Sequence, residues 1–168
     1  INNSTIKTVS IITRTTGNEG SVYVSGGYAY AAVQSDNELN IIDVSDPNNP
    51  SEVSVTAGLA QASDVVVVGN FAYVTAATGD QLTVLDVSNP NSPAEIANVG
   101  NATTMNGPRS LAIQGKYAYI AAYDGTAFIV VDISDPYNPI IVGSLTDATN
   151  LNQTRDVQGR GKYAYVSG

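Results

Sequence analysis

The sequence predicts an all-β fold in which one four-stranded antiparallel unit is used repeatedly, and three observations support this prediction. An aromatic-Ala-Tyr triplet recurs at intervals of 43, 46 and 46 residues. A strand-like segment ending in an aspartate turn with proline follows the first three triplets at constant spacing. Turn residues divide the chain into short β-branched runs. A repeat of this length is typical of a β-propeller blade. The triplets begin at Tyr28, Phe71, Tyr117 and Tyr163.

The middle repeat shows the four expected strands most clearly. A β-branched run over 64–68 ends at a glycine-asparagine turn, and a second strand over 71–77 ends at a threonine-glycine-aspartate turn. A third strand covers 82–87, and a fourth covers 94–99. The two prolines between them favour a turn, because proline presets φ and cannot donate to a sheet.

The expected strands are apolar on both faces, so both faces of each sheet must be covered. Sheets stacked on either side would cover them, and the small central residue of each triplet would allow close approach. The tyrosines are expected to pack between blades rather than to form a sugar-stacking platform. The central residues are Ala29, Ala72, Ala118 and Ala164, and the tyrosines are Tyr28, Tyr30, Tyr73, Tyr117, Tyr119, Tyr163 and Tyr165.

Constant spacing within the repeats predicts strands paired in fixed register. Only the connection that leads into the next repeat varies in length, which indicates a surface loop. The repeats cover about 20–62, 63–108 and 109–154, with partial blades at 1–19 and 155–168. We therefore expect three complete blades, partial blades at both ends, and a fragment of a larger propeller. The alternative is a partial propeller that self-associates through open edge strands.

The composition excludes several classes of function. A net charge of −8 and a sequence pI of about 4.1 are opposed to nucleic-acid binding and to electrostatic adhesion to anionic lipid. The chain has no cysteine and no histidine, which removes disulfides, thiolate nucleophiles, the usual zinc sites and histidine-dependent catalysis. No apolar run is long enough to cross a bilayer, so we expect no membrane insertion.

The combined motifs carry a family resemblance. Residues 42–47, 85–90 and 131–136 read Ile-Asp-Val-Ser-Asp-Pro or a close variant, and each follows an aromatic-Ala-Tyr triplet and a short strand. Residues 20–168 thereby resemble the LVIVD-repeat family of bacterial and archaeal β-propellers. The resemblance implies a location at the cell surface or outside the cell. It brings no catalytic residues to transfer.

An aspartate ends the third strand of every repeat, at Asp43, Asp86 and Asp132. We expect each carboxylate to accept backbone N–H groups of the turn that follows. The alternative is Ca²⁺ binding, because carboxylate oxygens suit that ion. Asn89 replaces the second acid in the middle repeat, which weakens that alternative. Because the turns explain the aspartates without a metal, we expect no obligatory ion or cofactor. The ligands of a Ca²⁺ site would be Asp43, Asp46, Asp132 and Asp135.

Two sets of loops are expected at the same end of the propeller: those between the second and third strands, and those between repeats. We call this end the loop face. One interpretation is solvated charge with Arg–carboxylate pairs that fasten neighbouring blades. The other is a binding face, because rigid scaffolds carry ligand-binding residues on loops. The candidate binding residues are Asp36, Glu38, Asp80, Met105, Arg109, Tyr123, Asp124 and Arg155.

These patterns predict a non-enzymatic extracellular or cell-surface module that binds a protein or a glycan through the loop face. Two alternatives stay open. One is a structural module whose edge strands assemble into a filament or sheath, and the other is a propeller hydrolase or lyase that uses carboxylates with a metal. Four sequons mark sites for glycosylation in a host that glycosylates. They begin at Asn2, Asn3, Asn101 and Asn152.

Overall fold

The computed structural model describes residues 19–168, in which fourteen strands form three four-stranded sheets and one two-stranded sheet. The first sheet contains β1 (Glu19–Ser25), β2 (Tyr28–Val33), β3 (Glu38–Asp43) and β4 (Ser51–Ala57). The second contains β5 (Ala62–Val68), β6 (Phe71–Ala76), β7 (Gln81–Asp86) and β8 (Ala94–Gly100). The third contains β9 (Pro108–Gln114), β10 (Tyr117–Ala122), β11 (Ala127–Asp132) and β12 (Ile140–Thr146), and the last contains β13 (Asp156–Arg160) and β14 (Tyr163–Ser167).

Within every sheet the strands pair antiparallel and in chain order, which confirms the three complete blades predicted from the repeats. The register also repeats, because the first residue of each triplet faces the aspartate that ends the third strand. The N-terminal partial blade falls outside the described residues, apart from Glu19. Membership of a larger propeller stays a prediction. No helix in residues 19–168 is long and apolar enough to cross a membrane.

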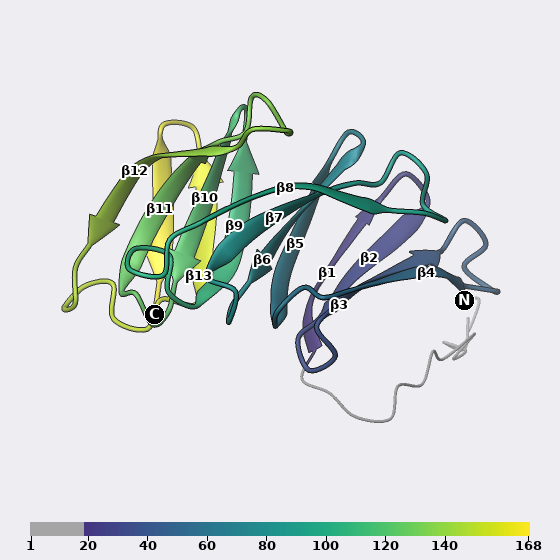
Figure 1. The fold of residues 1–168 in the computed structure, drawn as a ribbon, viewed down its shortest axis with the longest axis horizontal. Helices are drawn as coiled ribbons and strands as arrows, with labels where there is room; N and C mark the ends of the chain where they lie inside the picture. The colour runs from purple at the N-terminus through teal and green to yellow at the C-terminus, as the bar shows by residue number, and fades with distance from the viewer. Residues whose placement is uncertain (1–18) are drawn as a thin grey trace, which may run out of the picture.

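The sheets follow one another in chain order, each beside the next (Figure 1). Their first strands form the inner layer, because β1 contacts β5, β5 contacts β9, and β9 contacts β13. Each sheet then extends outward through its second, third and fourth strands. The inner strands therefore lie on the side of the sheets where a propeller has its channel.

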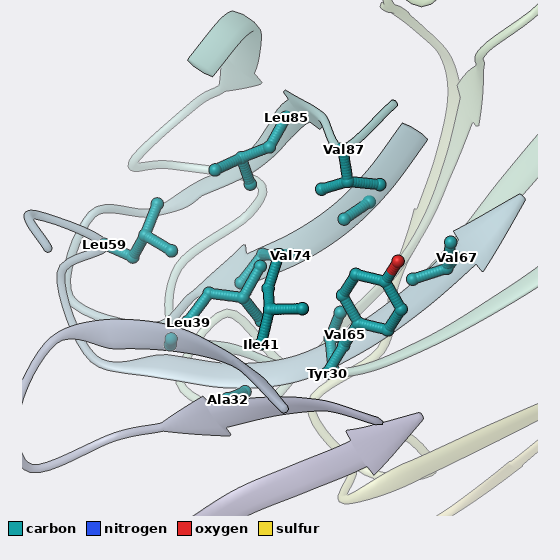
Figure 2. Close-up of a cluster of buried hydrophobic side chains, with 12 residues drawn as sticks. Tyr30, Ala32, Leu39, Ile41, Leu59, Val65, Val67, Val74, Leu85 and Val87 are labelled. Atoms are coloured by element: carbon teal, nitrogen blue, oxygen red, sulfur yellow. The ribbon is translucent and has the colours of Figure 1, made fainter. Parts of the chain in front are cut away.

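The core lies between neighbouring sheets, as the two-sided apolar strands predict. Figure 2 shows Tyr30, Leu39 and Ile41 of the first sheet packed against Val65 and Val74 of the second. A second cluster of the same kind joins the second and third sheets. Full burial of one such aliphatic side chain contributes roughly 1.5–3 kcal/mol. Stacking of blades is therefore the main source of stability.

The expected packing of the tyrosines holds for some positions and is wrong for others. Tyr30 and Tyr73 are buried between sheets. Tyr163 and Tyr165 of β14 are 60% and 59% exposed, because within the described residues no further sheet packs against their side of the last sheet.

The aspartates that end the third strands act as turn caps, as predicted. Oδ1 of Asp43 accepts the Ser45 N–H at 2.8 Å, and Asp132 accepts the Ser134 N–H at 2.9 Å. Asp46 and Asp135 cap the following turns in the same way, by accepting the N–H two residues ahead. These bonds lower the pKa values of Asp43 and Asp132. Among residues 19–168, no group of three or more acidic residues is placed so that it could hold a metal ion.

We predict that chelation leaves the melting temperature of the protein nearly unchanged. The capping carboxylates already have backbone partners, and the sheets are held by apolar packing. Differential scanning fluorimetry with and without EDTA measures the effect. A fall of about 10 °C on chelation, which corresponds to several kcal/mol for a chain of this size, would show that the turn aspartates are Ca²⁺ ligands.

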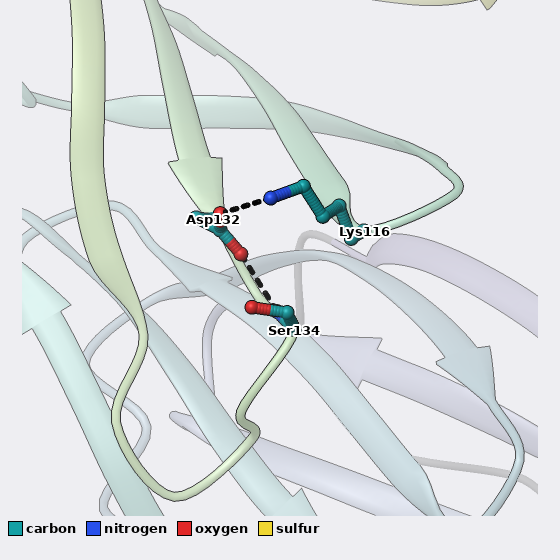
Figure 3. Close-up of polar contacts among 3 residues, drawn as sticks. All are labelled: Lys116, Asp132 and Ser134. Atoms are coloured by element: carbon teal, nitrogen blue, oxygen red, sulfur yellow. Dashed lines mark hydrogen bonds and ion pairs between the residues drawn. The ribbon is translucent and has the colours of Figure 1, made fainter.

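Asp132 differs from its counterparts in having a lysine partner (Figure 3). The Ser134 hydroxyl and N–H, and then Nζ of Lys116 at 2.9 Å, hold the pKa of Asp132 at about 2. Since this pKa lies below the ordinary aspartate value of 3.8, the contribution of the ionised carboxylate to folding is present above pH 3.8 and is lost as the pH falls towards 2.

We predict that Lys116→Met raises the pKa of Asp132. Carbon-detected NMR titration of the carboxyl groups measures this change directly. Asp86 is a matched internal control, because Ser88 caps it and Asn70 stands where the third repeat has Lys116. Its pKa should stay the same in both proteins. An unchanged Asp132 titration would show that the ion pair has no effect in solution.

Candidate binding site at the mouth of the channel

The loop face forms as the sequence predicts, and hydrogen bonds join its two sets of loops. Oδ1 of Asn37, in the β2–β3 turn, accepts the Gln61 N–H at 2.7 Å. Oδ1 of Asp80, in the β6–β7 turn, accepts the Gly107 N–H at 3.0 Å. Each turn thus caps the loop that enters the next sheet. Asp80 therefore has a structural role in a position where we expected a binding residue.

Several other candidates also belong to the framework of the loop face. Gly107 has φ +63°, and a Cβ there would collide with the Asp124 carboxylate, so this loop requires glycine. The candidates Asp36 and Glu38 lie in and after the β2–β3 turn, where Ser35 donates to Asp36.

Among the sequons, Asn101 and Asn152 are exposed, whereas Asn2 and Asn3 lie outside the described residues.

The prediction for Met105 is wrong. We expected it to be exposed on the loop face, yet its exposed fraction is 0%. It belongs to the core cluster between the second and third sheets. Its N–H donates to the Asn101 carbonyl at 2.7 Å, which turns the loop inward and places the side chain under it.

A repeated polar position ties the inner strands together, and we did not predict it from the sequence. Ser21, Asp64, Ser110 and Asp156 occupy this position in the four sheets. Ser21 Oγ accepts the Val65 N–H at 3.0 Å, Asp64 Oδ2 accepts the Leu111 N–H at 2.7 Å, and Ser110 Oγ accepts the Val157 N–H at 3.3 Å. Each inner strand therefore accepts a backbone hydrogen bond from the next. The signal was present, because the four residues keep the spacing of the triplets.

Asp64 is the half-buried carboxylate of this series. Burial raises its pKa, while hydrogen bonds from Ser21, Leu111 and Val65 act in the opposite direction. Its two oxygens accept hydrogen bonds from the sheet before it and the sheet after it. The carboxylate therefore links three blades through its hydrogen bonds.

Arg109 and Arg155 meet at one aromatic ring. The guanidinium carbon of Arg109 lies 5.3 Å from the centroid of Tyr123, and that of Arg155 lies 5.1 Å from it. Nη2 of Arg155 also donates to the Tyr123 hydroxyl at 3.4 Å. Neither arginine forms an ion pair with a carboxylate of residues 19–168. The expected Arg–carboxylate pairs between blades are thus wrong for these two residues, and cation–π contacts with Tyr123 hold them instead.

These three residues line a hollow of about 420 Å³ at the loop-face end of the inner strands. A larger hollow of about 600 Å³ follows the first strands of all four sheets, and its walls include Asp64 and Asp156 as well as both arginines. Cationic side chains therefore border both hollows, and carboxylates border only the larger one. The other residues that line the mouth are Gly20, Gln34 and Ser63.

The mouth is built from two repeat positions that differ between the sheets. Gly20, Ser63, Arg109 and Arg155 are equivalent, since they are separated by 43, 46 and 46 residues. Two small residues on one side leave space, and two arginines on the other side supply charge. Gly20 also meets a packing requirement, because a Cβ there would lie 2.5 Å from the Ser63 carbonyl oxygen. Gln34 and Tyr123 occupy the second position, at which the middle repeat has Ala77.

Comparison with known proteins identifies the repeats. The LVIVD repeat matches residues 16–56, 60–101 and 108–147. The matched segments agree with the three four-stranded sheets in number and order. No curated protein matches the sequence.

Solved structures share the fold at low sequence identity. A functionally unknown protein from Desulfotomaculum acetoxidans superposes with a TM-score of 0.73 and 11% identity, over 92% of this chain and 50% of its own. The periplasmic gluconolactonase of Pseudomonas aeruginosa gives 0.66 and 13% identity, over 77% and 41%. The computationally designed Ika4 protein gives 0.67 and 11% identity, over 94% of both chains. The chain spans half or less of the two natural proteins. Likeness at this level shows the fold alone.

Proposed function

Because the chain belongs to the LVIVD repeat family, whose repeats form its blades, we propose that it is a non-enzymatic binding module. Its ligand, a protein or a glycan, binds at the loop face over the mouth of the channel. The observation that carries this proposal is the pair of arginines at the mouth. They have no carboxylate partner in the described part of the chain, although the protein holds 15 Asp+Glu against 7 Lys+Arg. Loop residues on a rigid scaffold are the usual place for ligand binding.

We place the module at the cell surface or outside the cell. The absence of cysteine and histidine and the acidic charge are compatible with that location. The resemblance of the repeat motifs to a family with many surface and secreted members supports this location. Surface labelling of intact source cells with an antibody against the protein tests this part of the proposal, with signal only after cell lysis as the contrary outcome.

The binding proposal is tested with the immobilised protein against a panel of neutral and acidic glycans and purified extracellular proteins. We expect at least one member to bind, and Arg109→Ala/Arg155→Ala to lose that binding. The matched control is Arg160→Ala, which removes an exposed arginine at the end of β13 remote from the loop face. Binding that survives in the double variant would place the ligand elsewhere.

The enzyme alternative is tested on the same protein. The carboxylates of the channel wall, Asp64 and Asp156, are held in bonds between blades. We therefore expect no hydrolysis of sugar lactones or glycosides. Turnover by the wild-type protein that is lost on chelation would favour the metal-assisted enzyme instead.

The exposed aromatic face of β13–β14 supports a second candidate, which is assembly between chains. Tyr163 and Tyr165 project from an edge strand that pairs only with β13 among the described residues. Exposed edges of this kind recruit other strands. Light scattering at increasing concentration tests it, and Tyr165→Lys should prevent any growth in mass that is observed.

A further inference from the structure

Two positive charges meet at the mouth, and neither forms an ion pair with a carboxylate of residues 19–168. Arg109 and Arg155 both contact the ring of Tyr123, so both guanidinium groups are confined to one small region. Like charges repel, and the repulsion grows where water is partly excluded. An anion that contacts both guanidinium groups would offset that repulsion.

Arg109 also has an unsatisfied donor. Its Nε is buried and has no hydrogen-bond partner among the described residues. Buried N–H groups without an acceptor are rare in folded proteins. An arginine presents Nε and Nη as a planar fork that matches two oxygens of a carboxylate or phosphate. Arg109 also lines the hollow, so the side chain with the unsatisfied donor borders the space in which we place an oxyanion.

The rest of the hollow favours a polar ligand with room for a body beyond its charged group. Gly20 and Ser63 leave space opposite the arginines, and Gln34 adds an amide that can donate and accept. The volume of about 420 Å³ falls in the range of small-molecule sites. Asp64 and Asp156 line the larger hollow together with both arginines, so the carboxylates disfavour an anionic group that lies farther along the inner strands.

We propose that the mouth binds an oxyanion group, a carboxylate or a phosphate, carried by a sugar. This inference rests on the proposed binding function and names the chemistry of its ligand. Arg109 and Arg155 hold the oxyanion, and Tyr123 positions both arginines through its ring and hydroxyl. Gln34 and the polar rim contact the sugar ring. An acidic surface polysaccharide and a soluble sugar phosphate share this chemistry.

Isothermal titration calorimetry with four defined probes tests the inference. They are trigalacturonic acid, glucose 6-phosphate, and their uncharged counterparts galactotriose and glucose. We expect at least one acidic probe to bind at least tenfold more tightly than its neutral counterpart. Its affinity should fall as the salt concentration is raised. The tighter of the two acidic probes identifies the source of the oxyanion. Equal affinity for acidic and neutral probes, or no binding of either acidic probe, overturns the inference.

Matched variants locate the bound group. Arg155→Gln, which changes an exposed side chain, should weaken binding of the acidic probe at least tenfold. Arg109→Gln should have the same effect. Arg160→Gln removes the same charge at the other end of the inner strand and should stay within about twofold of the wild-type affinity, because screening limits long-range charge effects. Thermal melts show whether each variant is folded. If Arg155→Gln and Arg160→Gln behave alike, the oxyanion does not lie at the mouth.

The two levels of the proposal fail differently. A neutral glycan or a protein that binds the wild-type chain and is lost in both arginine variants would overturn the oxyanion chemistry and leave the binding module intact. If the arginine variants lose no ligand of any class, the loop face is not the binding site, and both proposals fail.

Discussion

We expect the Asp64→Ala variant to unfold about 3 kcal/mol more easily than the wild-type chain, because the change leaves buried donors of two neighbouring blades without an acceptor. Asp64 accepts hydrogen bonds from Ser21 Oγ of the preceding sheet and from the Leu111 N–H of the following one. For a chain of this size, the expected loss corresponds to a fall in Tm of about 6–12 °C. Urea denaturation followed by circular dichroism measures it.

A second substitution of Asp64, taken from the equivalent position of the other repeats, serves as the control. Asp64→Ser introduces the residue that the first and third sheets have at this position, where Ser21 and Ser110 accept the N–H of the next strand. We expect this variant to retain more than half of the stability that Asp64→Ala loses. Equal loss in the two variants would mean that side-chain volume, rather than the hydrogen bonds between blades, sets the stability of this layer.

The fold was predictable because a blade depends on local pattern. The strand–turn alternation, the constant register and the apolar character of both faces are all properties of one repeat, and three copies of the repeat report them independently. The middle repeat illustrates this: the expected strand over 71–77 is observed as Phe71–Ala76, and the expected strand over 94–99 as Ala94–Gly100.

The candidate site was predictable only in part, because it depends on contacts between repeats. Arg109, Tyr123 and Arg155 were named from their loop positions, but their meeting at one ring depends on the lateral placement of two blades. Carboxylates are abundant in the sequence, which favoured ion pairs; the structure instead uses Asp64 and Asp80 to accept backbone N–H groups. Comparison of equivalent positions across the repeats would have separated these roles.

Met105 shows how that comparison works. Leu59 stands 46 residues before it and Leu151 stands 46 residues after it. An apolar residue that recurs at the repeat period indicates packing, whereas the arginine position changes from glycine and serine to arginine along the chain. Leu59 is buried between the first two sheets (Figure 2). Met105 is buried in the same way between the second and third sheets. The variable positions of the repeats are therefore the better guide to the ligand site.

Met105→Ala should consequently destabilise the protein by roughly 2–5 kcal/mol, because it removes a fully buried side chain and leaves a cavity between two sheets. Met105→Leu, which preserves most of the volume and resembles the first repeat, should cost less than about 1.5 kcal/mol. Chemical denaturation of the three proteins measures both effects. A ligand contact would give the opposite pattern: Met105→Ala would melt like the wild-type chain while losing affinity for the acidic probe. That result would show that Met105 belongs to the binding surface and not to the core.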